Sequence, residues 1–210
     1  MELEYVLPAD IEKRSFEIIE SELKRKIPQS IKPVVMRVIH TTADFDHAED
    51  MYFSENVMDI AMNVLKRGAL IVTDTNMVYS GINKGALKKL GCECVCFMAD
   101  SDVAEKAAEL GITRAAASVD KAALLNRPII YAAGNAPTAL IRICEHVRKG
   151  TFLPKLVIGV PVGFVNVLQS KEMLIESGIP CIVTRSRKGG SNVAAAICNA
   201  LLYQLLQRVR

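Results

Sequence analysis

The sequence predicts an α/β fold, a three-layer sandwich in which a mainly parallel sheet of about five strands lies between helices on both faces. Five short apolar runs are nearly continuous rather than alternating, which is typical of strands buried on both faces. Helical patterns separate these runs, as parallel connections require. Because no linker, repeat or low-complexity segment interrupts the pattern, we expect residues 1–210 to form a single domain.

The first part of the chain is predicted to be helical. Asp10 is a candidate N-cap, and apolar residues after it repeat at helical spacing up to Leu23. Pro33 suits the first turn of a second helix, which ends among the small polar residues after His40. Ser54 is expected to cap a third helix, which stops at Gly68.

Strands and helices alternate in the rest of the chain. The predicted strands are residues 69–73, 92–98, 129–133, 156–160 and 181–184. The predicted helices are residues 84–90, 103–110, 115–125, 136–148, 171–177 and 192–208. In a parallel sheet, the loops that follow all the strands meet at the carboxyl edge, where open α/β sheets bind ligands.

Two of these loops have the chemistry of anion binding. Residues 187–191, Arg-Lys-Gly-Gly-Ser, combine positive charge with glycines that let backbone N–H groups approach a ligand, and a helix follows. Residues 134–137, Gly-Asn-Ala-Pro, also open a helix. Either loop alone could be an ordinary turn, but both at one edge favour a carboxylate or phosphate ligand. The candidate binding residues here are Asn135, Arg187, Lys188, Gly189, Gly190 and Ser191.

Composition excludes several classes of protein. The net charge of +3, the absence of Trp and the lack of a dense basic patch argue against nucleic-acid binding. Neither G-x-G-x-x-G after the first strand nor a P-loop motif occurs, which disfavours a nucleotide enzyme. No apolar run reaches membrane length and the acidic N-terminus does not resemble a signal peptide, so we expect a cytoplasmic protein without a membrane partner.

The six cysteines are expected to be free thiols. Cys92, Cys94 and Cys96 alternate along one predicted strand, whereas Cys144 and Cys198 lie in predicted helices. A metal site is the alternative for the first three, but no second Cys/His pair follows at the spacing of a zinc site. We therefore predict no metal site.

Three histidines are candidates for acid–base chemistry. His40 ends an apolar helix among threonine and aspartate side chains, which fits either catalysis or a partly buried structural role. His47 lies in a polar stretch and is expected to be solvated. His146 is near the end of a helix, where a structural interaction with the helix dipole suffices.

Several motifs together resemble the precorrin-8X methylmutase family. The similarity covers residues 5 to 203 in the same order, and the combination of motifs is specific. Residues 40–46 and 80–84 are more similar to the cobalt-handling branch than to the metal-free one. The motifs are Arg14-Ser15-Phe16, Arg37-Val38-Ile39-His40-Thr41, GNAPTAL at 134–140, PVGFV at 161–165 with QSKE at 169–172, and Arg187-Lys188-Gly189-Gly190-Ser191.

The resemblance implies an isomerase of cobalamin (vitamin B12) biosynthesis. Such an enzyme shifts a methyl group from carbon eleven to carbon twelve of ring C in precorrin-8 or cobalt-precorrin-8, giving hydrogenobyrinate or cobyrinic acid. The catalytic histidine corresponds to His40, and the substrate contacts correspond to Ser15, Arg37 and Arg114. The resemblance further implies a homodimer that holds the tetrapyrrole near the subunit interface. It implies no cofactor of the protein's own, since any cobalt is carried by the substrate.

Three positions depart from the family pattern. Ser186 and Asn166 stand where the family tends to have glycine, and Asn76 replaces a hydroxyl residue. These changes concern contacts with the rim of the macrocycle and do not involve His40.

Two other functions remain open from the sequence. A corrinoid-binding carrier without turnover is the main alternative, because tight product binding does not separate it from an enzyme. An α/β module for a nucleotide or sugar phosphate is disfavoured by the missing phosphate motifs. The sequence leaves open whether the natural substrate carries cobalt, which surface forms the dimer and how product is handed on.

Overall fold

The computed structural model describes residues 3–208 and confirms the α/β class. Within that range one sheet has the strand order β1-β6-β5-β4-β2-β3. Every neighbouring pair is parallel except β1 and β6, which are antiparallel. The strands are β1 Met51–Phe53, β2 Leu70–Thr73, β3 Glu93–Cys96, β4 Ile129–Ala133, β5 Leu156–Gly159 and β6 Cys181–Thr184.

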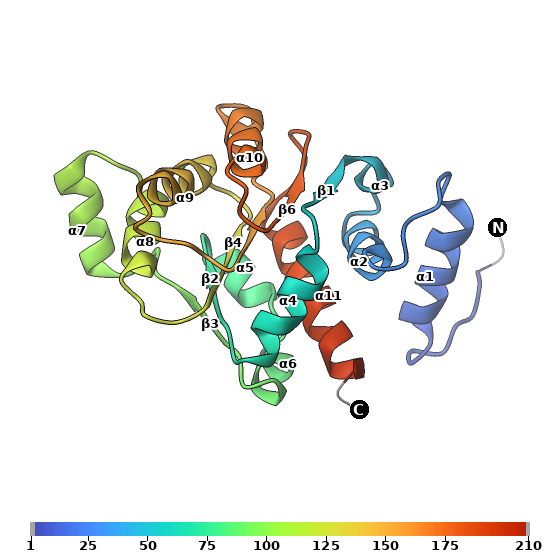
Figure 1. The fold of residues 1–210 in the computed structure, drawn as a ribbon. Coiled ribbons are helices and arrows are strands. Elements are labelled where there is room, and N and C mark those ends of the chain that lie inside the picture. Colours follow the sequence, from blue (N-terminus) through green and yellow to red (C-terminus); the bar gives the residue numbers. More distant parts are fainter. Residues whose placement is uncertain (1–2, 209–210) are drawn as a thin grey trace.

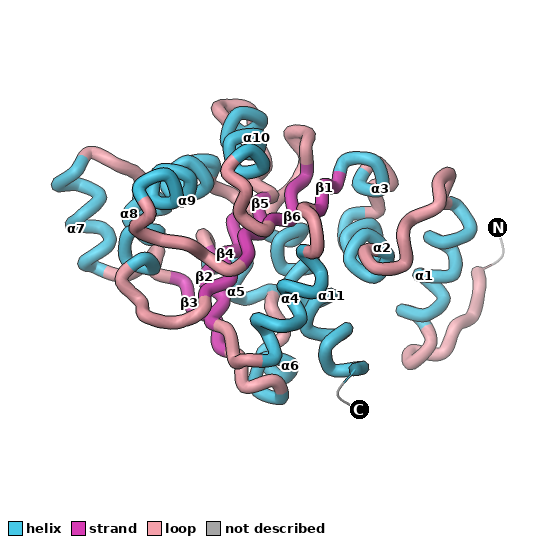
Figure 2. Tube along the Cα trace, viewed as in Figure 1, coloured by secondary structure: helices cyan, strands magenta, loops and turns pink. Residues whose placement is uncertain are grey.

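Helices cover both faces of the sheet (Figures 1 and 2). Helices α4, α5, α6 and α11 pack on one face, and α8, α9 and α10 pack on the other. Helix α7 lies outside α8, while α1 and α2 form a further layer outside α11. The helices are α1 Ile11–Glu22, α2 Lys32–Thr42, α3 His47–Asp50, α4 Val57–Lys66, α5 Asn76–Gly81, α6 Lys84–Lys89, α7 Ser101–Leu110, α8 Arg114–Ala123, α9 Pro137–Lys149, α10 Val167–Glu176 and α11 Ser191–Arg208.

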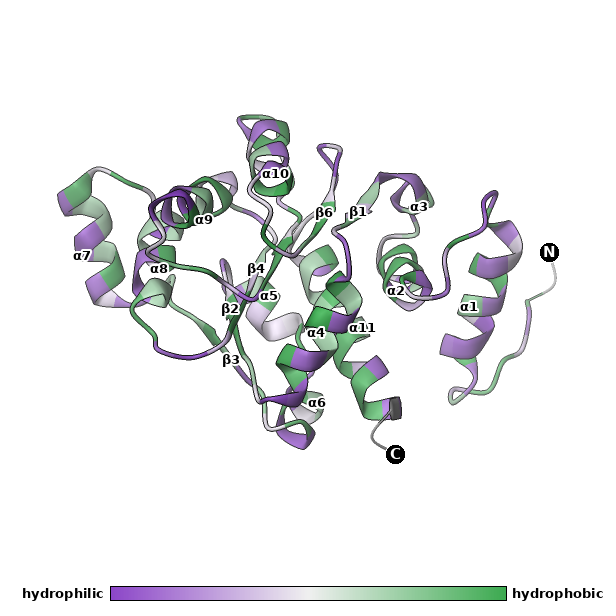
Figure 3. Cartoon of the chain, viewed as in Figure 1, coloured by the Kyte–Doolittle hydropathy of each residue, from purple (hydrophilic) through white to green (hydrophobic). Residues whose placement is uncertain are grey.

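Each central strand is apolar on both sides because it contributes to two cores. Ile130 and Ile158 pack against the α4–α11 side, whereas Tyr131 and Val157 pack against the α8–α10 side. The strands are therefore hydrophobic along their length, as the colours of Figure 3 show. Nearly continuous apolar runs in the sequence have this physical cause. No described helix is both long and apolar enough to cross a bilayer.

The prediction of five strands is one short. The additional strand, β1, has only three residues and pairs with the edge of β6, so it leaves almost no periodic signal. Ser54 was wrongly predicted to cap a helix. Its hydroxyl accepts a hydrogen bond from the Cys181 N–H at 2.9 Å, and this bond continues the β1–β6 pairing. Helix α4 begins at Val57, three residues after Ser54, and its N-cap is Asn56 at a φ of 55°.

The order of the strands creates a switch point between β2 and β4. From β2 the chain passes outward to β3 and then returns to β4 on the other side of β2. The connections on either side of this point lie on opposite faces of the sheet, and open α/β sheets bind ligands at the carboxyl edge beside such a point. The predicted binding edge would accordingly have β2 and β4 at its centre.

Gly159 ends β5 where two helices approach the sheet closely. A Cβ atom at this position would lie 2.6 Å from Leu174 Cδ2 and 3.3 Å from Leu140 Cδ1. Both leucines are fully buried, so neither side chain can move without disturbing the core between β5, α9 and α10.

We predict that Gly159→Ala lowers the free energy of unfolding by about 1–3 kcal/mol through overpacking. Urea denaturation measures this change. In the double variant Gly159→Ala/Leu174→Ala the penalty of the alanine should shrink, because the nearest clashing methyl group is gone. Equal penalties with and without Leu174 would assign the effect to the backbone instead.

Candidate active site

The carboxylate of Asp74 lies at the switch point and organises the loop after β4. It is fully buried and accepts hydrogen bonds from the N–H groups of Gly134 at 2.9 Å, Asn135 at 2.7 Å and Ala136 at 2.8 Å. Burial raises the pKa of Asp74, and the three N–H donors oppose that change. These N–H groups are consequently directed at the protein's own carboxylate.

The residue after Asp74 joins the end of β2 to α11. Thr75 Oγ1 lies 3.0 Å from Ser191 Oγ, and it also accepts the Val78 N–H as the N-cap of α5. The ends of β2 and β4 and the start of α11 therefore form one connected unit.

Lys171 holds the glycine-rich loop after β6 from within the protein. Its side chain is fully buried, and Nζ donates to Thr184 Oγ1 at 3.0 Å, to the Ser186 carbonyl at 2.6 Å and to the Lys188 carbonyl at 2.9 Å. Burial lowers the pKa of Lys171 to about 8, although the nearby Asp50 carboxylate acts in the opposite direction. All three ammonium protons thus have acceptors on one short segment.

The glycines of this loop permit close contact with β5. A Cβ atom on Gly189 would lie 2.2 Å from the Val160 carbonyl oxygen, and the φ of Gly189 is 150°. The N–H of Gly190 donates to the same carbonyl at 2.9 Å. The Gly190 N–H is therefore used inside the protein, which leaves the charged side chains as this loop's clearest means of binding a ligand.

Those charged side chains differ in their surroundings. Lys188 Nζ donates to Asp44 at 2.7 Å and to Asp46 at 2.6 Å, and these bonds raise the pKa of Lys188. The guanidinium of Arg187 is exposed and lies 5.9 Å from the centre of the Phe164 ring. Among the described ion pairs none involves Arg187, so its guanidinium faces solvent without a charged partner.

The same loop is tied to the segment after α2. Asp50, at the end of α3, accepts hydrogen bonds from the Ser186 N–H at 2.6 Å and the Ser186 hydroxyl at 2.8 Å. With the contacts of Lys188 to Asp44 and Asp46, this places the C-terminal end of α2 at the carboxyl edge of the sheet.

His40 lies in the last turn of α2, close to that edge. Its ring is half-buried, with its centroid 5.2 Å from that of Phe16 and the two planes at 53°. Hydrogen bonds to the imidazole are absent among the described residues, so both ring nitrogens are free to meet a ligand. A histidine in this state can donate or accept a proton.

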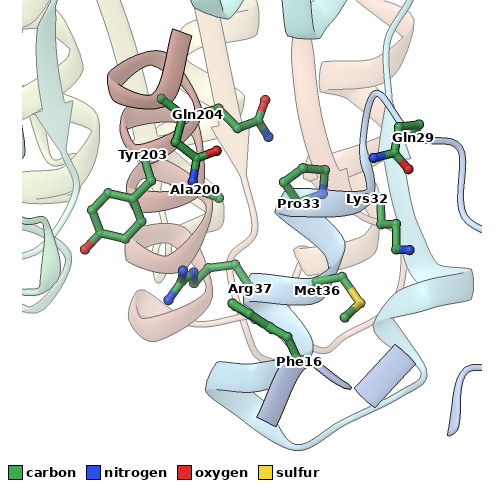
Figure 4. Close-up of a pocket in the computed structure, with 10 residues that line it drawn as sticks. Phe16, Gln29, Lys32, Pro33, Met36, Arg37, Ala200, Tyr203 and Gln204 are labelled. Carbon is green, nitrogen blue, oxygen red and sulfur yellow. The ribbon is translucent and has the colours of Figure 1, made fainter. Parts of the chain in front are cut away.

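Arg37, one helical turn before His40, is held between two aromatic rings. Its guanidinium carbon lies 4.9 Å from the centre of Phe16 and 5.1 Å from that of Tyr203 (Figure 4). It also pairs with Glu12, and this hydrogen bond lowers the pKa of the Glu12 carboxyl. Phe16 thus contacts both His40 and Arg37, and the three side chains form one cluster.

The other residues predicted to contact the substrate are Ser15, Asn135 and Arg114, and they lie on three different parts of the fold. Ser15 precedes Phe16 on α1, and its hydroxyl donates to the Ile11 carbonyl at 2.8 Å. Asn135 is exposed beside the Asp74 carboxylate. Arg114 begins α8 and is exposed, and α8 packs on the face of the sheet opposite to the one that α2 helps to cover.

The structure corrects one expectation about the histidines. His47 is only 2% exposed rather than solvated, and burial lowers its pKa. His146 has the structural role expected of it, with Nε2 2.7 Å from Asp120 and Nδ1 2.7 Å from the Thr151 hydroxyl. All six cysteines are free, and no cluster of potential metal ligands occurs in the described part of the chain.

The sequence matches the family model of precorrin-8X methylmutase over residues 10–204. The chain belongs to the precorrin-8X methylmutase family. Methylmutases of this family are isomerases, and this settles the enzyme class. The alternative of a carrier without turnover has no support among the relatives.

Individual relatives extend over nearly the whole methylmutase chain. The cobalt-precorrin-8 methylmutase of Salmonella typhimurium is 43% identical, covering 94% of this chain and 96% of its own. That of Leptospira interrogans is also 43% identical, covering 93% of each. The solved precorrin-8X methylmutase of Thermus thermophilus has a TM-score of 0.87 at 37% identity, covering 95% of this chain and 98% of its own.

The departures from the methylmutase pattern have visible local consequences. Asn166 adopts a φ of 58°, a left-handed conformation that glycine takes freely and asparagine tolerates. The Ser186 hydroxyl, absent from a glycine, donates to Asp50 and accepts the Lys188 N–H at 3.0 Å. Asn76 is the exposed first residue of α5, and nothing in the structure explains the change there.

Sequence reasoning missed four residues of this methylmutase site. Asp74 follows a strand, as solvated aspartates often do. Lys171 lies in a polar segment whose composition is typical of an exposed helix. Asp50 and Tyr203 gave no signal at all. Two clues were available: Asp74 lies in a polar stretch directly after a predicted strand, and Lys171 lies within the QSKE motif. Both clues point to a role but not to burial.

We predict a pH-dependent difference in stability between the wild type and Lys171→Met. Between pH 8 and the ordinary lysine pKa of 10.5, the native protein has released a proton that the unfolded chain still binds. Raising the pH through this window therefore stabilises the native wild type, by up to about 3 kcal/mol relative to the variant. Urea unfolding at several pH values measures this difference.

The exposed Lys155→Met is the matched control for the loss of one lysine charge outside the core. A difference for Lys171→Met that stays constant over the same window would show that Lys171 titrates as an ordinary lysine.

Proposed function

We propose that this methylmutase acts on cobalt-precorrin-8, with His40 as the catalytic acid. The names of the relatives from Salmonella typhimurium and Leptospira interrogans favour the cobalt form of the substrate. The observation that carries the proposal is the position of His40, whose unpaired ring lies beside Arg37 and near the polar loops of the carboxyl edge. In this proposal the protein is cytoplasmic and needs no cofactor of its own, because cobalt arrives within the substrate.

The substrate is a large disc with apolar faces and a rim of acetate and propionate carboxylates. Cations suit the rim. Arg37 lies against Phe16, and Arg187 lies near Phe164 in the loop that Lys188 joins to Asp44. Apolar surface suits the faces, and Phe164 and Val165 are 83% and 80% exposed beside Arg187. These cationic and apolar side chains hold the ring in position and take no part in the reaction.

The reaction conserves all the atoms of the substrate. The bond from the methyl group to carbon eleven breaks as a bond to carbon twelve forms, within the conjugated system of ring C. A proton that His40 gives to ring C makes the carbon that receives the methyl group more electron-poor, and the imidazole takes that proton back afterwards. General acid catalysis supplies roughly 10²–10⁴-fold, and positioning of the ring must supply much of the remainder.

His40→Ala is expected to abolish measurable turnover of cobalt-precorrin-8 and to leave the fold and product binding largely intact. The proton donor is lost, while the helix keeps a residue of high helical propensity. The visible spectrum follows turnover directly, since carbon eleven changes from sp³ to sp² and conjugation lengthens. His146→Gln, remote from this cluster, is the control. Turnover by His40→Ala at the wild-type rate would refute the acid role.

We further propose that the protein is a homodimer whose partner subunit helps to enclose the disc. One 23.0 kDa chain has little surface with which to cover so large a ligand, and exposed Phe164 and Val165 are apolar surface that remains to be buried. Light scattering at micromolar concentration should give twice the chain mass. A fully active protein that remains monomeric under the same conditions would contradict this proposal.

A further inference from the structure

A cavity of about 290 Å³ lies between α2 and α11, away from the carboxyl edge (Figure 4). One part of its wall is apolar, formed by Phe16, Met36 and Tyr203. The rest is polar and includes the carboxamide of Gln204 and the guanidinium of Arg37. The cavity is smaller than pockets that enclose a whole drug-sized ligand, so it suits one substituent of a larger molecule.

Gln204 gives the cavity an unsatisfied hydrogen-bond donor. Its side-chain nitrogen, Nε2, is buried and has no partner among the described residues. Figure 4 shows the side chain extending from α11 toward Pro33 on α2. A buried N–H group without an acceptor destabilises a protein, and a ligand in the adjoining cavity can supply the missing acceptor once the carboxamide turns toward it.

Arg37 provides positive charge on the same wall. One of its terminal nitrogens, Nη1, donates to Glu12, and the rings of Phe16 and Tyr203 fix the plane of the guanidinium. A guanidinium has five N–H donors, so this pairing leaves others for a second acceptor. The neighbouring Lys32, by contrast, is already paired with Glu20.

The cavity is within reach of a corrinoid bound at His40. Arg37 lies one helical turn from His40, a rise of about 5 Å. The Phe16 ring contacts both side chains and separates the cavity from the imidazole. A disc whose ring C lies against His40 therefore presents part of its rim to the mouth of this cavity.

We propose that the cavity is a subsite for one carboxylate arm of the corrinoid rim. The methylene groups of an acetate or propionate arm lie against Phe16 and Met36, and the carboxylate accepts hydrogen bonds from Gln204 Nε2 and Arg37. This assignment rests on the proposed function, and it adds Gln204 as a residue that determines how the disc is oriented over His40.

Gln204→Leu tests the subsite, with cobyrinic acid as the probe and the visible spectrum as the measure of binding. The variant removes a buried unpaired donor, so its melting temperature should rise or stay unchanged. Its affinity should nevertheless fall about tenfold, because one charge-assisted hydrogen bond to the ligand is lost. A merely structural role for Gln204 would not combine unimpaired stability with weaker binding.

Gln204→Glu provides a second test through charge. Its carboxylate repels a ligand carboxylate, and we expect a loss of about ten- to a hundredfold in affinity for cobyrinic acid. A corrinoid whose rim carboxylates are all carboxamides should lose much less, since an amide can donate to the new carboxylate. Asn63→Asp, on the exposed face of α4, adds the same charge elsewhere and should bind both ligands as the wild type does.

Wild-type affinity in both stable Gln204 variants, with turnover intact, would overturn the subsite and leave the proposed function standing. Equal losses for the carboxylate and carboxamide ligands would also overturn it, because charge would then not be recognised. A wild-type protein that neither binds cobyrinic acid nor turns over cobalt-precorrin-8 would refute the function and the subsite together.

Discussion

The carboxylate of Asp74 is the interaction on which the rest of the site depends. Three consecutive N–H groups after β4 converge on it, at the point where the strand order reverses and a free crevice would otherwise lie. In many open α/β sheets such N–H groups bind the anion of a ligand. Here the protein supplies the anion itself, which fixes the loop and moves recognition outward to side chains. A surface of side chains can contact a broad disc over a larger area than a narrow phosphate site can.

Other polar groups extend the same arrangement. Lys171 fixes the backbone of the glycine-rich loop, Asp50 holds Ser186, and Lys188 reaches two aspartates beyond α2. Each bond joins elements that apolar packing alone would leave free to slide. The helix that bears His40 lies outside the α/β sandwich, and these polar bonds, with the apolar contacts of α2 on α11, set its position relative to the sheet.

The sequence revealed the sandwich because strands buried on both faces need unbroken apolar runs, and four of the five predicted strands lie within one residue of the observed ones at each end. It failed for β1, whose three residues acquire their conformation only from β6. His40 and Arg37 were predicted from local motifs. Asp74 and Lys171 were not, because their meaning comes from partners distant along the chain and from burial that no local pattern records.

The antiparallel strand β1 also determines when the site can form. Its only neighbour in the sheet is β6, whose residues are synthesised about 130 positions later, as the sequence separations of 136 for Asp50–Ser186 and 144 for Asp44–Lys188 illustrate. Contacts between residues so far apart in the sequence form slowly during folding. On the ribosome, the segment carrying His40 must wait for nearly the entire chain before it finds its place. A chain that ended before residue 181 would lack β6, the glycine-rich loop and α11, so the segment that carries His40 would have nothing to hold it at the carboxyl edge.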